Sequence, residues 1–295
     1  MSDPVLVRRR FLILSGIVGL GISRLVGKAF GLASEATPRL LSASLELGGT
    51  WEASPVDAVL RVLTRMRAVC LADVRLLSDR QPEIIRVENH TSGPPAIWLH
   101  NDRTNVAWIM VDIGPDDWSK LSYQFGHELG HVLCNSWSAG SKPHPPCQWL
   151  EESMVEAFSI RGLGLLAPSW ERDPPFAGDS AFSAKIREYR DNLFKKYGGA
   201  AGQESDAEVA SWFRATRSAL EQNSLNGIEG PLIVRIVGEL EHDIACVEDM
   251  GALNRWPSRS AVPLEEYLRL WEKSCTEVHA PGRLPARLRS LLGVS

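Results

Sequence analysis

Helical periodicity dominates the pattern of apolar positions along the chain. From Pro55 to Asp73, apolar residues recur at intervals of three and four, which is typical of a helix with one buried face. The same spacing predicts further helices over residues 117–136, 149–166, 182–197, 206–222, 231–250 and 263–275. The second half of the chain is therefore expected to be mostly helical.

Strand patterns are confined to the first half of the chain. Three short runs rich in β-branched and aromatic residues predict strands over residues 84–87, 96–100 and 106–112. Turn-forming residues separate these runs. Together the patterns predict an α+β fold, in which a small mixed sheet packs on the helix at 117–136 and a mostly helical C-terminal part follows.

The first 36 residues have the features of an export signal. Arg8, Arg9, Phe11 and Leu12 resemble the twin-arginine motif RRxFL. The apolar run that follows is shorter than the roughly 20 residues that a membrane-spanning helix needs. We therefore expect residues 1–36 to be a targeting segment of an exported protein. The alternatives are an uncleaved anchor that contacts the membrane, or a surface helix of a cytoplasmic protein.

Composition and charge narrow the classes of function. Hydrophobic residues make up 44% of the chain and charged residues 23%, which excludes wholesale disorder. After the basic N-terminal segment, 27 Lys and Arg face 34 Asp and Glu, and an acidic body argues against a nucleic-acid partner. Five cysteines without a CxxC pair form neither a disulfide scaffold nor a zinc ribbon. Cys134 and Cys147 could be bridged or could be two free thiols.

The most informative motif is HELGH at residues 127–131. On a helix, His127 and His131 lie about 40° apart around the axis, so both imidazoles can bind one metal ion. Glu128 lies about 100° from His127, where a carboxylate can act as the base on a metal-bound water. The alternative is a helix with two surface histidines and a neighbouring acid.

Catalytic zinc usually has three protein ligands and one water. Trp137 stands where a metzincin has its third histidine, which excludes that class. Glu152 and Glu156 lie four apart, so Glu152 can bind the metal while Glu156 accepts a hydrogen bond from a ligand imidazole. His144 and Glu151 are the alternative third ligands. These acids could also form a solvated, acidic start of a helix.

These two segments resemble the gluzincins, zinc metallopeptidases whose third ligand is a glutamate on a second helix. WLEE at residues 149–152 resembles the WLNE of aminopeptidase-N-type enzymes, and Glu152 and Glu156 resemble the Glu-x-x-x-Asp of thermolysin-like enzymes. Residues 151–168 also resemble the second helix of ImmA/IrrE-type zincins. The resemblance covers about residues 105–168 and implies a zincin-like fold, and no single family matches throughout.

We therefore expect a zinc-dependent hydrolase, a metallopeptidase acting on a peptide or protein substrate. Residues 37–170 would form the catalytic core and residues 171–295 a helical region. By analogy with zincins, an extended substrate would pair with an edge strand at 106–112. The oxyanion donor is unassigned, with Tyr123, Tyr189 and His242 as candidates. The alternatives are a non-catalytic metal-binding protein, or a helical interaction or membrane-associated domain with a chance HExxH.

Overall fold

The computed structural model describes six ranges of the chain: residues 39–51, 54–75, 78–90, 93–198, 205–222 and 230–294. The predicted targeting segment, residues 1–36, lies outside these described residues. Within them, no helix combines the length and the apolar character needed to cross a membrane.

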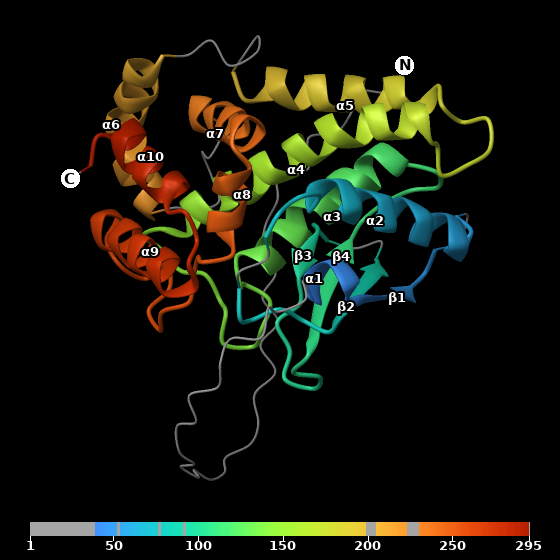
Figure 1. The fold of residues 1–295 in the computed structure, drawn as a ribbon, viewed down its shortest axis with the longest axis horizontal. Helices are drawn as coiled ribbons and strands as arrows, with labels where there is room; N and C mark the ends of the chain where they lie inside the picture. Colours follow the sequence, from blue (N-terminus) through green and yellow to red (C-terminus); the bar gives the residue numbers. More distant parts are fainter. Residues whose placement is uncertain are drawn as a thin grey trace.

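The sheet is small and mixed, as predicted. It consists of β1 (Ser44–Gly49), β2 (Ile84–Asn89), β3 (Ala96–Ile97) and β4 (Val106–Val111), in the order β1-β2-β4-β3. The first, second and fourth strands are parallel, and β3 pairs with β4 in the antiparallel sense (Figure 1). The expectation that residues 106–112 form an edge strand is therefore wrong, because β4 lies between β2 and β3.

One face of the sheet is covered by helices. Ile85 and Val87 of β2 alternate with half-buried neighbours, and their partners in β4, Ala107 and Ile109, are also fully buried. Two helices, α2 (Val56–Cys70) and α3 (Trp118–Leu133), contact each other, α2 contacts β1, and α3 contacts β4. The alternating burial of the central strands therefore creates the apolar surface on which the HELGH helix lies.

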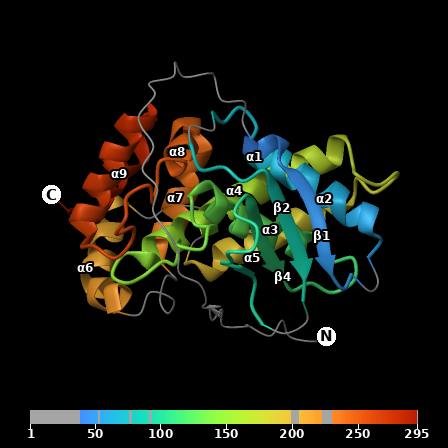
Figure 2. The ribbon, with the colours of Figure 1, turned by 90° about the horizontal axis from the view of Figure 1, so that it is seen from below.

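A long central helix joins the two halves of the molecule. This helix, α4 (Gln148–Arg172), packs on α2 and α3, and α5 (Phe182–Lys196) packs on α4 (Figures 1 and 2). In both views the sheet lies to one side of α4, and the C-terminal helices lie to the other. Residues 148–163 of α4 are all buried, so this helix forms the centre of the core.

The rest of the described chain is helical. The helices are α1 (Arg39–Ser42), α6 (Asp206–Gln222), α7 (Pro231–His242), α8 (Ile244–Met250), α9 (Leu264–Val278) and α10 (Arg283–Leu292). The single helix predicted over 231–250 is broken at Asp243, whose backbone is extended and whose side chain accepts a hydrogen bond from the Ala245 N–H at 3.0 Å. Asp243 thereby caps α8 as a separate helix.

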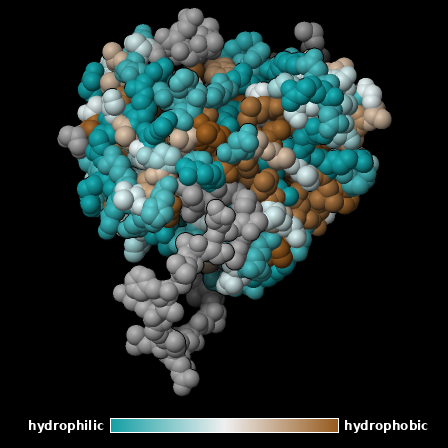
Figure 3. All heavy atoms as spheres, in the orientation of Figure 1, coloured by the Kyte–Doolittle hydropathy of each residue, from teal (hydrophilic) through white to brown (hydrophobic). Residues whose placement is uncertain are grey.

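Both halves contribute to one buried apolar cluster. The cluster includes Ile85 of the sheet, Trp149 of α4 and Trp271 of α9. On the face shown in Figure 3, most of the coloured surface is hydrophilic, and apolar residues form a band across the middle. Among the described residues, the large apolar side chains with the greatest exposure are Leu41, Val56 and Leu165. The boundary between residues 170 and 171 stays a prediction, and α4 runs through it to Arg172.

Candidate metal centre

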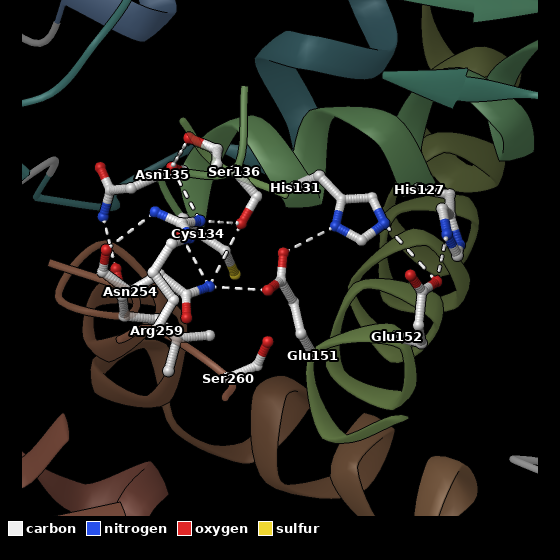
Figure 4. Close-up of polar contacts among 12 residues, drawn as sticks. His127, His131, Cys134, Asn135, Ser136, Glu151, Glu152, Asn254, Arg259 and Ser260 are labelled. Atoms are coloured by element: carbon white, nitrogen blue, oxygen red, sulfur yellow. Dashed lines mark hydrogen bonds and ion pairs between the residues drawn. The ribbon is translucent and has the colours of Figure 1, made fainter. Parts of the chain in front are cut away.

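Two helices bring His127, His131 and Glu152 together. All three are buried, and each offers a ligand atom within 4.8 Å of the other two. The Glu152 Oε2 atom lies 3.4 Å from Nε2 of His127 and 3.6 Å from Nε2 of His131 (Figure 4). Two ligand atoms bound tetrahedrally to zinc at about 2.0–2.1 Å lie roughly 3.4 Å apart. The described residues therefore contain a group that could hold a metal ion.

Two glycines let α3 and α4 approach closely enough to form this group. A Cβ atom added to Gly130 would lie 2.9 Å from Cβ of Val155, and one added to Gly126 would lie 2.9 Å from Oγ of Ser159. Ser159 in turn donates a hydrogen bond to the Tyr123 carbonyl at 2.6 Å. Small residues on α3 therefore bring its backbone against α4, at the level where the histidines meet the glutamates.

A carboxylate holds the outer nitrogen of each imidazole. Nδ1 of His127 lies 2.9 Å from Glu156 Oε2, and Nδ1 of His131 lies 2.8 Å from Glu151 Oε1. An ionised carboxylate can only accept, so each Nδ1 atom is the donor. A neutral imidazole in this tautomer turns the lone pair of Nε2 inward, and this is the arrangement of histidines that bind metals.

These two carboxylates are themselves anchored. Glu156 Oε1 accepts from the Tyr123 hydroxyl at 2.5 Å and from the Tyr197 hydroxyl at 2.8 Å. Glu151 Oε2 accepts from the Asn254 side-chain amide at 2.6 Å (Figure 4). Each imidazole orientation is therefore fixed by hydrogen bonds that extend beyond α3 and α4, through Tyr197 for His127 and through Asn254 for His131.

The chain turns sharply after His131. Asn135 has a left-handed backbone with φ of 63°, and the Ser136 N–H donates to the His131 carbonyl at 2.9 Å. This is the Schellman pattern that ends many helices. The Asn135 side chain donates to the carbonyls of Gly251 and Leu253, at 2.9 and 2.7 Å. The end of the HELGH helix is therefore tied to the residues that follow α8.

The site is strongly acidic for a buried region. Glu128, Glu151, Glu152 and Glu156 are each at most 3% exposed, which excludes the solvated acidic helix start. Burial favours a lower pKa for His131, but the charges of Glu152 and Glu151 raise that pKa well above its usual value. Burial likewise favours a higher pKa for Glu152, but His131 and His127 lower it to about 2.

This electrostatic balance bears on whether a metal fits. Because a buried carboxylate without a counter-charge is costly, Glu152 needs a cation beside it, which is either a proton on the His131 imidazole, as its raised pKa indicates, or a metal ion bound by the two Nε2 atoms. Among the described residues, Glu152 Oε1 has no hydrogen-bond partner. Two imidazole nitrogens and one carboxylate are also a common ligand set of catalytic zinc. The residues present therefore fit a divalent cation.

The other sequence candidates take different places. His144 is exposed in the loop before α4 and belongs to no such group among the described residues. The Tyr123 hydroxyl donates a hydrogen bond to Glu156. The Tyr189 ring packs on the Tyr123 ring, with 5.5 Å between the ring centroids. His242 is exposed at the end of α7. The identity of an oxyanion donor stays open.

Three supporting residues were not anticipated from the sequence. Glu151 was considered only as a rival ligand, yet it lies against the outer nitrogen of His131. Tyr197 contacts Glu156 although it lies 41 positions further along the chain. Asn254 contacts Glu151 from 103 positions further along. No local spacing signals such contacts. Of the residues at the site, only those in the HELGH and WLEESMVE segments are related by a helical spacing. That spacing identifies His127, His131 and Glu152 as neighbours.

The cysteines form no bridge. All five, including Cys134 and Cys147, are free and buried. Burial raises the pKa of the Cys134 thiol well above its usual range, and the charge of Glu151 adds to the effect. Buried thiols with a raised pKa are poor nucleophiles, and the metal-binding group found among the described residues contains no cysteine.

Comparisons of the chain with protein-family models, with curated proteins and with solved structures found no match.

Proposed function

We propose that this protein is a zinc-dependent hydrolase, and specifically a metallopeptidase. The observation that carries the proposal is the arrangement of His127 and His131. Both inner nitrogens face Glu152, and both outer nitrogens are held by separate buried carboxylates. A purely structural pair of histidines needs no such orientation.

In this proposal His127, His131 and Glu152 hold the metal. A zinc ion bound there would lower the pKa of a water molecule towards about 7 and would polarise the carbonyl of the substrate. Glu156 and Glu151 keep the two imidazoles in the tautomer that binds metal. The preference for zinc follows from the ligand set of two nitrogens and one carboxylate oxygen.

Glu128 is the proposed general base. It follows His127 on α3, is buried and is not one of the three proposed ligands. Glu128 accepts the proton of the attacking water and returns it to the leaving nitrogen of the peptide bond. The assignment of peptide bonds as substrate comes from the resemblance of the two helices to gluzincins.

Metal analysis tests the site itself. The purified full chain should hold one zinc per molecule, and His131→Ala and Glu152→Ala should hold none. Glu156→Ala should weaken zinc binding by roughly 10–100-fold, because the imidazole of His127 loses its anchor. His144→Ala is the matched control and should keep the full complement. Loss of zinc in Glu151→Ala with retention in Glu152→Ala would contradict the ligand assignment.

Hydrolysis of a broad peptide library tests the activity separately. Cleavage that requires zinc and disappears in Glu152→Ala would support a peptidase. A protein that binds one zinc per chain but cleaves no peptide would instead be the non-catalytic metal-binding alternative. A chain without stoichiometric zinc would overturn both of these interpretations.

A further inference from the structure

A second polar site lies beside the turn that ends α3. It is a pocket of about 250 Å³ lined by arginines 80, 255 and 259 together with Ser138 and Ser141. We propose that this pocket binds a small oxyanion, the phosphate or carboxylate group of a ligand. The proposal rests on the positive charges and the hydrogen-bond donors that line this pocket, and it does not depend on the metal centre.

Arg259 is the main reason for the proposal. The residue is only 8% exposed, none of the described ion pairs includes it, and the charge of Glu151 acts on it from beyond ion-pair distance. Its guanidinium donates to the Asn254 carbonyl at 3.0 Å, to the Asn135 carbonyl at 3.1 Å and to Ser136 Oγ at 2.6 Å (Figure 4). Its Nε atom is buried without a hydrogen-bond partner. The groups that contact the guanidinium directly are therefore all neutral, and a buried cation without a contacting anion is costly.

Arg80 adds a second positive charge to the same pocket. It is exposed, its described side-chain hydrogen bond goes to the Arg255 carbonyl at 3.0 Å, and none of the described ion pairs includes it. Burial lowers the pKa of Arg259 and the charge of Glu151 raises it, while the charge of Arg80 lowers it, so the two guanidiniums repel each other. An anion bound between the two guanidiniums would offset this repulsion and would accept a charge-assisted hydrogen bond from each of them.

Arg255, the third arginine of the pocket, differs from the other two because it forms ion pairs with carboxylates. It pairs with Asp79 at 2.8 Å and with Glu277 at 3.3 Å, so its charge is already balanced. Arg80 and Arg259, which take part in none of the described ion pairs, are therefore the two arginines available to bind the ligand. Guanidinium groups match the planar or tetrahedral oxygen atoms of carboxylates and phosphates. Ser138 and Ser141, whose hydroxyls lie 2.7 Å apart, complete the polar lining of the pocket.

Calorimetric titration of the full chain at constant ionic strength tests the proposal, with inorganic phosphate and acetate as the probes. We expect saturable binding of one anion per chain. Arg80→Ala should weaken that binding by at least tenfold, since a hydrogen bond to a charged group contributes about 1.5–3 kcal/mol. Arg80 is the residue to change because its side chain is exposed, whereas replacing Arg259 would break three buried hydrogen bonds.

Arg269→Ala is the matched control. Arg269 is an exposed arginine of α9 that pairs with Glu266 at 2.5 Å, outside the pocket, so its loss should leave anion binding unchanged. Tighter binding of phosphate would point to a phosphate-bearing ligand, and tighter binding of acetate to a carboxylate. Absence of saturation with both probes, or equal binding by wild type and Arg80→Ala, would overturn the proposal and leave only a general salt effect.

Discussion

At the scale of single residues, the buried carboxylates of the candidate centre occupy different positions. Glu152 faces the inner nitrogens of both histidines, and Glu156 and Glu151 bind the outer nitrogens. Glu128 lies beside His127 on the same helix and is buried without being part of the ligand group. These four glutamates are chemically alike, so the different roles proposed for them follow from their positions alone. Each role can be tested by its own substitution.

Glu128→Gln tests the proposed general base. Gln has nearly the same shape and can still hydrogen-bond a water molecule, but it cannot accept a proton. We expect full zinc content and an unchanged melting temperature, with a hydrolytic rate lowered by at least roughly 10²–10⁴-fold. Metal analysis, thermal melting and peptide turnover measure the three quantities. Near-normal turnover would remove Glu128 from the mechanism, and loss of zinc would make it a ligand.

At the scale of elements, the close contact between α3 and α4 depends on glycine. Gly130→Ala places a methyl group 2.9 Å from Cβ of Val155, and overpacking of this kind costs about 1–3 kcal/mol. We expect a lower melting temperature and weaker zinc binding, because the histidines move relative to Glu152. Gly238→Ala is the matched control on α7, where an added Cβ meets no atom within 4 Å.

The control should behave in the opposite way. Ala exceeds Gly in helix propensity by about 0.8–1.0 kcal/mol, so Gly238→Ala should raise the melting temperature and leave zinc binding unchanged. Thermal melting of both variants, with and without a chelator, separates packing from metal binding. If Gly130→Ala also raised the melting temperature, the helices would not be in the tight contact described.

Element prediction from the sequence succeeded where a long segment had a clear apolar period. The helices over 117–136 and 149–166 and the strand over 106–112 correspond to α3, α4 and β4. Periodicity missed β1, a short strand in which only Leu45 and Leu47 alternate with polar residues before two glycines. It also failed for α10 and for the break at Asp243, where a side-chain cap rather than an apolar interval sets the boundary.

At the scale of the whole molecule, the C-terminal half reaches into the candidate centre through Asn254. The Asn254 side chain is fully buried. Its Nδ2 atom donates to Glu151, and its Oδ1 atom accepts from the Tyr267 hydroxyl at 3.1 Å. The sequence predicted the two helices of the site from their apolar period, and the spacing of four residues paired His127 with His131 and Glu152 with Glu156. It could not predict Asn254, because a single asparagine in a loop has no spacing that relates it to Glu151.

Asn254→Asp tests this long-range support. Asp has nearly the same shape and can still accept from Tyr267, but it replaces a donor with an acceptor beside Glu151. We expect weaker zinc binding, by roughly 10–100-fold, because Glu151 is pushed away from His131. Competition with a zinc-binding dye measures the affinity. Asn105→Asp, an exchange of an exposed asparagine that bonds Glu83, is the control, and equal zinc affinity in both variants would contradict the role of Asn254.

The N-terminal segment carries a prediction that is independent of the fold. A fusion of residues 1–40 to a reporter should be exported in a bacterium with twin-arginine transport. Replacement of Arg8 and Arg9 by Lys should stop that export, since the motif depends on the arginine pair. Cell fractionation measures the distribution of the reporter. Retention of the unchanged fusion in the cytoplasm would show that the segment is not an export signal.

The hydrogen bond between Asn254 and Glu151 also sets an order of events during synthesis. The two residues are 103 positions apart. At a translation rate of roughly 5–20 residues per second, Asn254 is added about 5–20 s after Glu151. During that interval the rest of α4 and the helices that follow it are synthesised, and Glu151 lacks its amide partner. The proposed zinc site would therefore reach its full affinity only after Asn254 has been added, and we expect metal loading in the cell to follow translation rather than accompany it.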